Sequence, residues 1–242
     1  MLKIDGLTKS YNKGEIRAVD DISLEIGDGE IFGFLGPNGA GKTTTIKMIV
    51  GLLKPDDGEI LLDGMDVWEE PLKAKSRISY VPDNPEIYDR LSGIEYLNFI
   101  GDMYGIPIGE RSEKIKHFTS VFNIGNALGD IISSYSHGMK QKLVLTAALM
   151  SNPDLFILDE PMVGLDPKSS FNLKEIMRTM CNEGKSVFFS THVMEVAEKL
   201  CDRIAIINKG KIIAMGTMEE LRRTAQEKES LENIFLELTE NE

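Results

Sequence analysis

A glycine-rich loop between an apolar run and a helix-forming run constrains the fold of this chain more than any other feature. The loop reads Gly36-Pro-Asn-Gly-Ala-Gly-Lys-Thr43 and follows Ile31–Leu35, which is typical of a buried strand. Thr44–Val50 comes next and predicts a helix that ends at Gly51. A strand, a glycine loop and a helix in this order predict an α/β fold with a site for nucleotide phosphates. A chance glycine turn is the alternative, and both flanking segments argue against it.

The residue types of the loop suit the binding of a triphosphate. Glycine lets the backbone wrap closely, so that successive N–H groups converge on one anion, and the positive end of the following helix attracts the same charge. Lys42 supplies a cation for the β- and γ-phosphates, Thr43 offers a hydroxyl to Mg²⁺, and Thr44 adds a donor to phosphate. The residues predicted to bind nucleotide here are Gly36, Pro37, Asn38, Gly39, Ala40, Gly41, Lys42, Thr43 and Thr44.

A second informative segment is Asp154–Pro161, in which four apolar residues precede the carboxylates Asp159 and Glu160. The pattern predicts a central parallel strand that is buried on both faces and opens toward a ligand at its carboxyl end. Asp159 is expected in the Mg²⁺ shell, and Glu160 could polarise the attacking water. A solvated Asp-Glu pair at a strand end is the alternative.

Length and composition limit the number of domains and the kinds of partner that this chain can have. A chain of 242 residues with 42% hydrophobic residues suits one large domain with a sizeable core. No signal peptide and no run of 18 apolar residues is apparent, so we expect no membrane span. A formal net charge of −12 argues against nucleic acid as a partner, because phosphate contacts need clustered Lys and Arg. Cys181 and Cys201 follow no metal-ligand spacing and predict two free thiols in a reducing compartment.

The remaining patterns predict an α/β core interrupted by helices. Further strands are expected at Leu2–Leu7, Val19–Ile26, Gly58–Leu62, Arg77–Pro82, Lys185–Ser190, Asp202–Asn208 and Lys211–Ala214. Helices are expected at Ser92–Tyr104, Glu110–Phe122, Gly138–Met150, Pro167–Cys181 and Thr191–Leu200, with a capping box at Thr217–Glu220. We assign 1–83 and 151–242 to the core of a single domain, about 84–150 to an inserted helical subdomain, and 217–242 to C-terminal helices. The stripe Leu231, Ile234, Phe235 and Leu238 is expected to pack on the core.

The ordered set of motifs resembles the ATP-binding subunit of ABC transporters over nearly the whole chain. Gly36–Thr43 resembles Walker A, Leu155–Glu160 resembles Walker B, Tyr135–Gln141 is similar to the family signature (commonly Leu-Ser-Gly-Gly-Gln), Gly164–Asp166 resembles the D-loop, and Ser190–His192 resembles the switch histidine segment. The resemblance implies a P-loop NTPase (RecA-like) core with an antiparallel β subdomain and an inserted α-helical subdomain. It also implies ATP and Mg²⁺ as ligands and ATP hydrolysis as the reaction.

The resemblance further implies roles for single residues. Lys42, Glu160 as general base and His192 at the γ-phosphate would be catalytic. Tyr11 would stack on adenine, although its residue type also fits an ordinary strand-end aromatic. Asp83 stands where the family usually has Gln, so its role as a metal ligand beside Thr43 and Asp159 is left open.

The signature implies a head-to-tail dimer, homodimeric or closely heterodimeric, with two ATP molecules between the subunits. Ser136, His137 and Gly138 would contact the nucleotide held by the other copy, and Asp166 would couple the two sites. His137 replaces a usual glycine; it either tolerates the start of a helix or adds a donor near phosphate.

The translocation path would then be a transmembrane permease on a separate chain, with this chain cytoplasmic and peripheral on the inner face of the cell membrane. The resemblance places the permease contact after Asp83, around Ile87, Tyr88 and Leu91, and favours an exporter. Three alternatives compete: a soluble ABC-type ATPase acting on ribosomes or DNA, another P-loop enzyme such as a kinase or GTPase, and an ATP-gated assembly module that barely hydrolyses. The transported substrate is not predicted.

Overall fold

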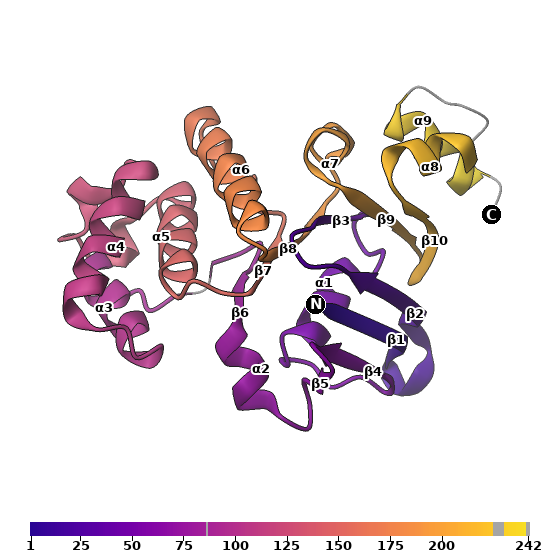
Figure 1. The fold of residues 1–242 in the computed structure, drawn as a ribbon, viewed down its shortest axis with the longest axis horizontal. Coiled ribbons are helices and arrows are strands. Elements are labelled where there is room, and N and C mark those ends of the chain that lie inside the picture. Colours follow the sequence, from indigo (N-terminus) through magenta and orange to yellow (C-terminus); the bar gives the residue numbers. More distant parts are fainter. Residues whose placement is uncertain (86, 225–229, 241–242) are drawn as a thin grey trace.

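The computed structural model describes residues 1–85, 87–224 and 230–240, and it contains two β-sheets (Figure 1). A four-stranded sheet, in the order β2-β1-β4-β5, is formed by β1 (Leu2–Tyr11), β2 (Ile16–Ile26), β4 (Asp57–Leu62) and β5 (Met65–Asp66). A six-stranded sheet, in the order β10-β9-β3-β8-β7-β6, is formed by β3 (Ile31–Leu35), β6 (Ile78–Val81), β7 (Leu155–Asp159), β8 (Ser186–Thr191), β9 (Arg203–Asn208) and β10 (Lys211–Gly216).

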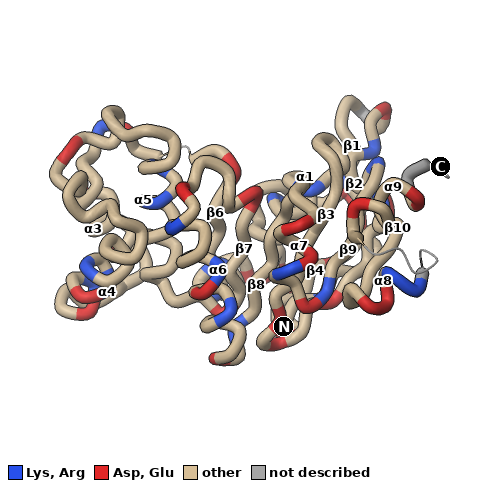
Figure 2. The backbone as a smooth tube through the Cα atoms, turned by 90° about the horizontal axis from the view of Figure 1, so that it is seen from above, with Lys and Arg blue, Asp and Glu red and all other residues tan. Residues whose placement is uncertain are grey.

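The helices lie around and between these sheets. They are α1 (Lys42–Ile49), α2 (Pro71–Arg77), α3 (Gly93–Met103), α4 (Ile108–Val121), α5 (His137–Met150), α6 (Pro167–Asn182), α7 (Met194–Leu200), α8 (Met218–Thr224) and α9 (Leu231–Glu240). Seen from above, α3, α4 and α5 gather at one end of the molecule, and β10, α8 and α9 lie at the other (Figure 2). The predicted α/β fold class, with an antiparallel sheet and a helical insertion, is confirmed.

The six-stranded sheet is parallel except at one edge, where β10 pairs antiparallel with β9. We expected β7 at the centre, but it lies between β6 and β8, one strand from the edge, and β3 and β8 form the centre. All five residues of β7 are nevertheless buried, because the sheet is covered on both faces. A run of apolar residues predicts that a strand is buried on both faces, but it does not predict the position of the strand in the sheet.

The two faces of the sheet belong to different parts of the core. Phe156 and Leu158 of β7 pack in a cluster with residues of α3, α5 and α6, whereas Leu155 and Ile157 pack with residues of β1, β2, β4 and α1. This alternation is the two-residue period of a strand. Phe188 of β8 lies within 6.0 Å of Phe32, ring centroid to centroid, on the second face. The sheet therefore holds the helical end and the antiparallel sheet together through separate apolar layers.

Several predicted elements are correct in kind and differ at their ends. Ser92 and Glu95 form a capping box at the start of α3, and Ser136 caps α5 by accepting a hydrogen bond from the Met139 N–H. β1 extends to Tyr11, beyond the predicted end at Leu7, because its pairing with β2 continues through register shifts. The sequence patterns predicted neither β5 nor α2. Helix α2 has no apolar stripe, because Ala74 is its only buried residue.

The predicted helix Thr191–Leu200 is wrong at its start. Thr191 is the last residue of β8 and pairs with Leu35, and the helix begins at Met194. The Thr191 hydroxyl oxygen accepts a hydrogen bond from the Val193 N–H at 3.0 Å, which forms a local turn in place of helix. His192 consequently lies on the connection between β8 and α7.

Two predictions for the C-terminal end, the capping box and the packing of the apolar stripe, are confirmed among the described residues. Thr217 and Glu220 form the expected capping box at the start of α8. In α9, Leu231 and Ile234 are fully buried and pack with Leu35 of β3, and Phe235 and Leu238 pack against the same cluster. Residues 225–229 and 241–242 of the predicted helical segment lie outside the described residues.

Candidate nucleotide site

The glycine loop joins the end of β3 to α1 by a path that side chains would block. A Cβ atom on Gly36 would lie 2.4 Å from the carbonyl oxygen of Ile207 in β9. Gly41 has φ +110°, and a Cβ atom there would lie 2.4 Å from the carbonyl oxygen of Ala18. Both glycines are therefore required by close backbone approach, and the loop is pressed against two neighbouring strands.

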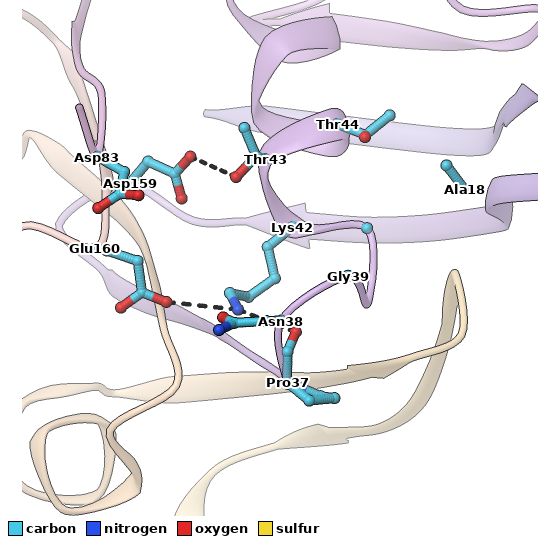
Figure 3. Close-up of a pocket in the computed structure, with 11 residues that line it drawn as sticks. Ala18, Pro37, Asn38, Gly39, Lys42, Thr43, Thr44, Asp83, Asp159 and Glu160 are labelled. Carbon is cyan, nitrogen blue, oxygen red and sulfur yellow. Dashed lines mark hydrogen bonds and ion pairs between the residues drawn. The ribbon is translucent and has the colours of Figure 1, made fainter. Parts of the chain in front are cut away.

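Lys42 points back into this loop. Its side chain is 6% exposed, and Nζ donates to the carbonyl oxygens of Gly36 at 2.7 Å and Pro37 at 3.3 Å. The same ammonium lies 3.4 Å from Oε1 of Glu160 at the end of β7 (Figure 3). A buried ammonium needs such partners, and it is positioned to interact with any anion that enters the loop.

Thr43 and Asp159 present oxygen atoms to the same pocket. Thr43 Oγ1 donates to Asp159 Oδ2 at 2.7 Å, and this contact joins the start of α1 to the end of β7 (Figure 3). Asp159 is 1% exposed, and its Oδ1 accepts a hydrogen bond from the Ser190 hydroxyl of β8. Ser190 was not predicted as a site residue. A polar residue at the carboxyl end of an apolar strand was the signal that could have indicated it.

Glu160 leaves the end of β7 in a left-handed conformation, with φ +49°. Its Oε1 lies 3.0 Å from Nδ1 of His192, and its Oε2 accepts from the His192 N–H at 3.4 Å. Its own N–H donates to the carbonyl oxygen of Ser190 at 3.2 Å. Lys42, Glu160 and His192, predicted from three separate segments, thus form one chain of contacts.

Asp83 follows β6 and lines the same pocket as Asp159 and Glu160 (Figure 3). Burial raises the pKa of the Asp83 carboxyl, and repulsion by the Asp159 and Glu160 carboxylates raises it further. Burial, followed by the charges of Asp159 and Asp83, also raises the pKa of the Tyr80 hydroxyl on β6. Burial and the two neighbouring carboxylates therefore both disfavour the charged form of Asp83 at the predicted phosphate site.

Other predicted residues lie away from this pocket. Tyr11 ends β1 and is 40% exposed, while Ser136, His137, Gly138 and Asp166 cap or begin α5 and α6. None of these five lines the pocket, which is bounded by Ala18, Pro37, Asn38, Gly39, Gly41, Lys42, Thr43, Thr44, Asp83, Asp159 and Glu160. Ala18 was not predicted, because its place depends on the approach of β2 to the loop and leaves no local sequence signal.

In the described part of the chain, no group of three or more His, Cys, Asp and Glu side chains is arranged to hold a metal ion. No described helix is both long enough and apolar enough to cross a bilayer. Cys181 is buried, Cys201 is half-buried, and both are free thiols as predicted.

The fold and this pocket define a P-loop nucleoside triphosphatase. Comparison with known proteins narrows the class: residues 19–163 match the family model described as ABC transporter. The linearmycin resistance ATP-binding protein LnrL of Bacillus subtilis (strain 168) is 41% identical over 221 residues, covering 91% of this chain and 70% of LnrL. The daunorubicin/doxorubicin resistance ATP-binding protein DrrA of Streptomyces peucetius is 38% identical over 221 residues, covering 91% of this chain and 66% of DrrA.

A solved structure, described as the ATP binding subunit of an ABC transporter, has a TM-score of 0.93 to this chain at 32% identity, covering 99% of both chains. The chain belongs to the ABC transporter family and is an ATP-binding subunit with ATPase activity. Subunits of this kind work with separate membrane permease subunits, as predicted. A kinase, a GTPase or a soluble non-transport ATPase is not favoured.

Proposed function

We propose that this chain hydrolyses Mg-ATP at the loop between β3 and α1, between two copies of the cassette, to drive export through a separate permease. The observation that carries the proposal is the chain of contacts from Lys42 through Glu160 to His192, next to the Thr43–Asp159 pair. The cation Lys42 and the proposed base Glu160 line the pocket beside the glycine loop, and His192 contacts Glu160.

Thr43 and Asp159 would hold Mg²⁺. Their Oγ1 and Oδ2 atoms lie 2.7 Å apart, and hydroxyl and carboxylate oxygens are the ligands that Mg²⁺ accepts beside nucleotide phosphates and water. The lack of a larger ligand cluster among the described residues agrees with an ion that is bound mostly by the nucleotide. When bound, Mg²⁺ would neutralise charge on the phosphates. Asp83 faces the same space, and its carboxylate offers a further oxygen at the cost of added repulsion.

Glu160 would accept the proton of the attacking water, and Lys42 would turn from the Gly36 carbonyl toward the γ-phosphate. His192, 3.0 Å from Glu160, would fix the carboxylate and contact the same phosphate. The loop N–H groups would stabilise the charge of the transferring phosphoryl group. Tyr11, exposed at the end of β1, remains available to stack on adenine.

A second copy would complete each site. Ser136, His137 and Gly138 begin α5 outside the pocket, so a head-to-tail pair of cassettes, related by a two-fold axis, would bring them to the nucleotide of the other subunit. ATP would bridge the two subunits through its γ-phosphate, and hydrolysis would release them. Asp166 would then lie near the axis.

The permease would dock on the exposed aromatic surface at the start of the helical part. Tyr88 is 59% exposed and stacks edge-on against Phe99 at 5.5 Å, and Met103 continues this surface along α3. Ile87 and Leu91 instead pack against the core, so we place the contact on Tyr88 and not on these two. Export is proposed because LnrL and DrrA are named for drug resistance. The cytoplasmic face of the membrane is the proposed location of the chain.

Phosphate release by the purified chain tests the reaction. Turnover should require Mg²⁺, stop with EDTA, and fall to background in Lys42→Ala. Turnover that persists in Lys42→Ala would show that the loop is not the catalytic site. A wild-type protein that binds ATP without measurable turnover would instead favour the assembly module.

A further inference from the structure

The start of α5 is in close contact with the segment that follows β7 in the same chain. A Cβ atom on Gly138 would lie 2.4 Å from the carbonyl oxygen of Gly164, and Gly164 itself has φ +78°. A Cβ atom on Gly164 would lie 2.7 Å from Cδ2 of His137. Neither glycine leaves room for a side chain, so α5 and the segment 160–166 cannot slide past one another without breaking this contact.

One turn further along α5, Lys142 forms an ion pair with Asp166, Nζ to Oδ2, at 2.6 Å. Asp166 also caps α6, because its carboxylate accepts from the N–H groups of Lys168 at 3.1 Å and Ser169 at 3.0 Å and from the Ser169 hydroxyl at 2.6 Å. The Lys142 ammonium and these donors hold the pKa of Asp166 well below its usual range. Asp166 is thus fully engaged inside its own subunit.

The segment between Glu160 and Asp166 is short and internally bonded. The Val163 N–H donates to the Glu160 carbonyl oxygen at 3.1 Å, and the Leu165 N–H donates to the Met162 carbonyl oxygen at 3.3 Å. Its first residue is the proposed general base, and its last is paired to α5. A displacement of α5 would therefore move Glu160 as well, because the short segment 160–166 connects the two.

Gln141 is a buried polar residue of α5 beside this junction. Its side chain is fully buried, and neither amide atom has a hydrogen-bond partner among the described residues. It lies on the side of α5 shared by Gly138 and Lys142, which both contact the segment. A buried amide without partners is unfavourable, so a small shift of α5 against the segment that supplied backbone partners would be stabilising.

We propose that Lys142 is a positioning residue that links the two nucleotide sites of the dimer. The inference rests on the dimer proposed above, in which the start of α5 contacts the nucleotide of the partner. Lys142 connects that contact, through Asp166, to Glu160 of its own subunit. Binding of ATP at one site then aligns the base at the other, and hydrolysis should be cooperative in ATP.

The test compares variants of two lysines. Lys142→Met keeps the aliphatic stem and removes the charge, and Lys142→Arg keeps the charge. The control, Lys114→Met, removes an ion pair within α4, Lys114–Glu110 at 2.7 Å, and a hydrogen bond to the Met150 carbonyl oxygen at the other end of α5. Rates of phosphate release against ATP concentration give kcat, KM and the Hill coefficient. Dimer formation is measured independently of turnover. Each variant is combined with Glu160→Gln, and its molecular mass is determined in the presence of Mg-ATP.

We expect Lys142→Met to lower the Hill coefficient to 1, to lower kcat, and to raise KM by about fivefold or more, which is the lower end of usual site-to-site coupling of affinities. Its dimer should still form, and Lys142→Arg and Lys114→Met should behave as wild type. In Lys142→Met, Asp166 stays half-exposed and still caps α6, so the fold should be retained, with Lys142→Gln as a second test of the same loss of charge.

Unchanged cooperativity and kcat in Lys142→Met and Lys142→Gln would overturn the inference, as would equal losses in Lys114→Met. Absence of a dimer in the Glu160→Gln protein itself would instead refute the proposed function, and the two failures are distinguishable.

Discussion

Replacing Ser190 by alanine should destabilise the protein by removing a hydrogen bond to a buried charge. The Ser190 side chain is fully buried, and its hydroxyl donates to Oδ1 of Asp159, which is itself 1% exposed. The same hydroxyl accepts from the Glu160 N–H at 3.2 Å, but that N–H also donates to the Ser190 carbonyl oxygen at 3.2 Å and keeps this acceptor in the variant, so the main loss is the charge-assisted bond to Asp159. Such bonds contribute about 1.5–3 kcal/mol to stability.

The free energy of unfolding without nucleotide, measured by urea titration, should fall by about 1.5–3 kcal/mol in Ser190→Ala. For a chain of this size, that change corresponds to a fall in Tm of about 3–12 °C. The matched control is Ser79→Ala on β6, which removes a part-buried bond between the neutral hydroxyls of the buried Ser79 and of Ser151. The control should lose about 0.5–1.5 kcal/mol. A loss in Ser190→Ala below about 0.5 kcal/mol, or no greater than the control, would refute the reasoning about Asp159.

Three further predictions concern turnover, coupling and the thiols. Glu160→Gln should lower kcat by about 10²–10⁴-fold, because a general base is lost, while ATP binding measured by titration calorimetry survives; near-wild-type turnover excludes Glu160 as the base. Asp83→Gln should leave ATP affinity unchanged and alter the stimulation of hydrolysis by the reconstituted permease; if both quantities stay wild-type, Asp83 is structural. Burial raises the pKa of Cys181 to about 11 and raises that of Cys201, so both thiols should react slowly with Ellman's reagent at pH 8 until urea unfolds the chain. Since both thiols are held neutral in the fold, stability should decrease as pH rises above about 8.5, and fast native-state labelling would contradict the burial argument.

The parts of the site that were predicted from the sequence are those in which one short segment contains both the functional residues and the strand or loop that positions them. Gly36–Thr43 includes the glycines that close approach requires and the lysine that occupies the loop. Asp159 and Glu160 directly follow the strand that buries them. In both segments, the order of residues along the chain determines which groups reach the pocket.

The parts that were missed depend on contacts between distant segments. Ala18 lines the pocket because β2 passes beside Gly41. The position of β7 next to the edge strand depends on which strands pair with each other. The apolar residues of β7 do not encode this strand order. The Lys142–Asp166 pair joins two helices that are adjacent only after folding. Thr191 was assigned to a helix because the residues around it in the sequence do not indicate its pairing with Leu35.

The most direct measurement of the central claim is the mass of the Glu160→Gln protein in solution, with and without Mg-ATP, by light scattering after size exclusion. We predict one chain of 27.0 kDa without nucleotide and twice that mass with Mg-ATP, returning to one chain with ADP. Ser136→Arg, which changes the start of α5 outside the loop, should bind ATP and fail to pair. A Glu160→Gln protein that binds ATP and keeps the mass of one chain at saturation would contradict the account.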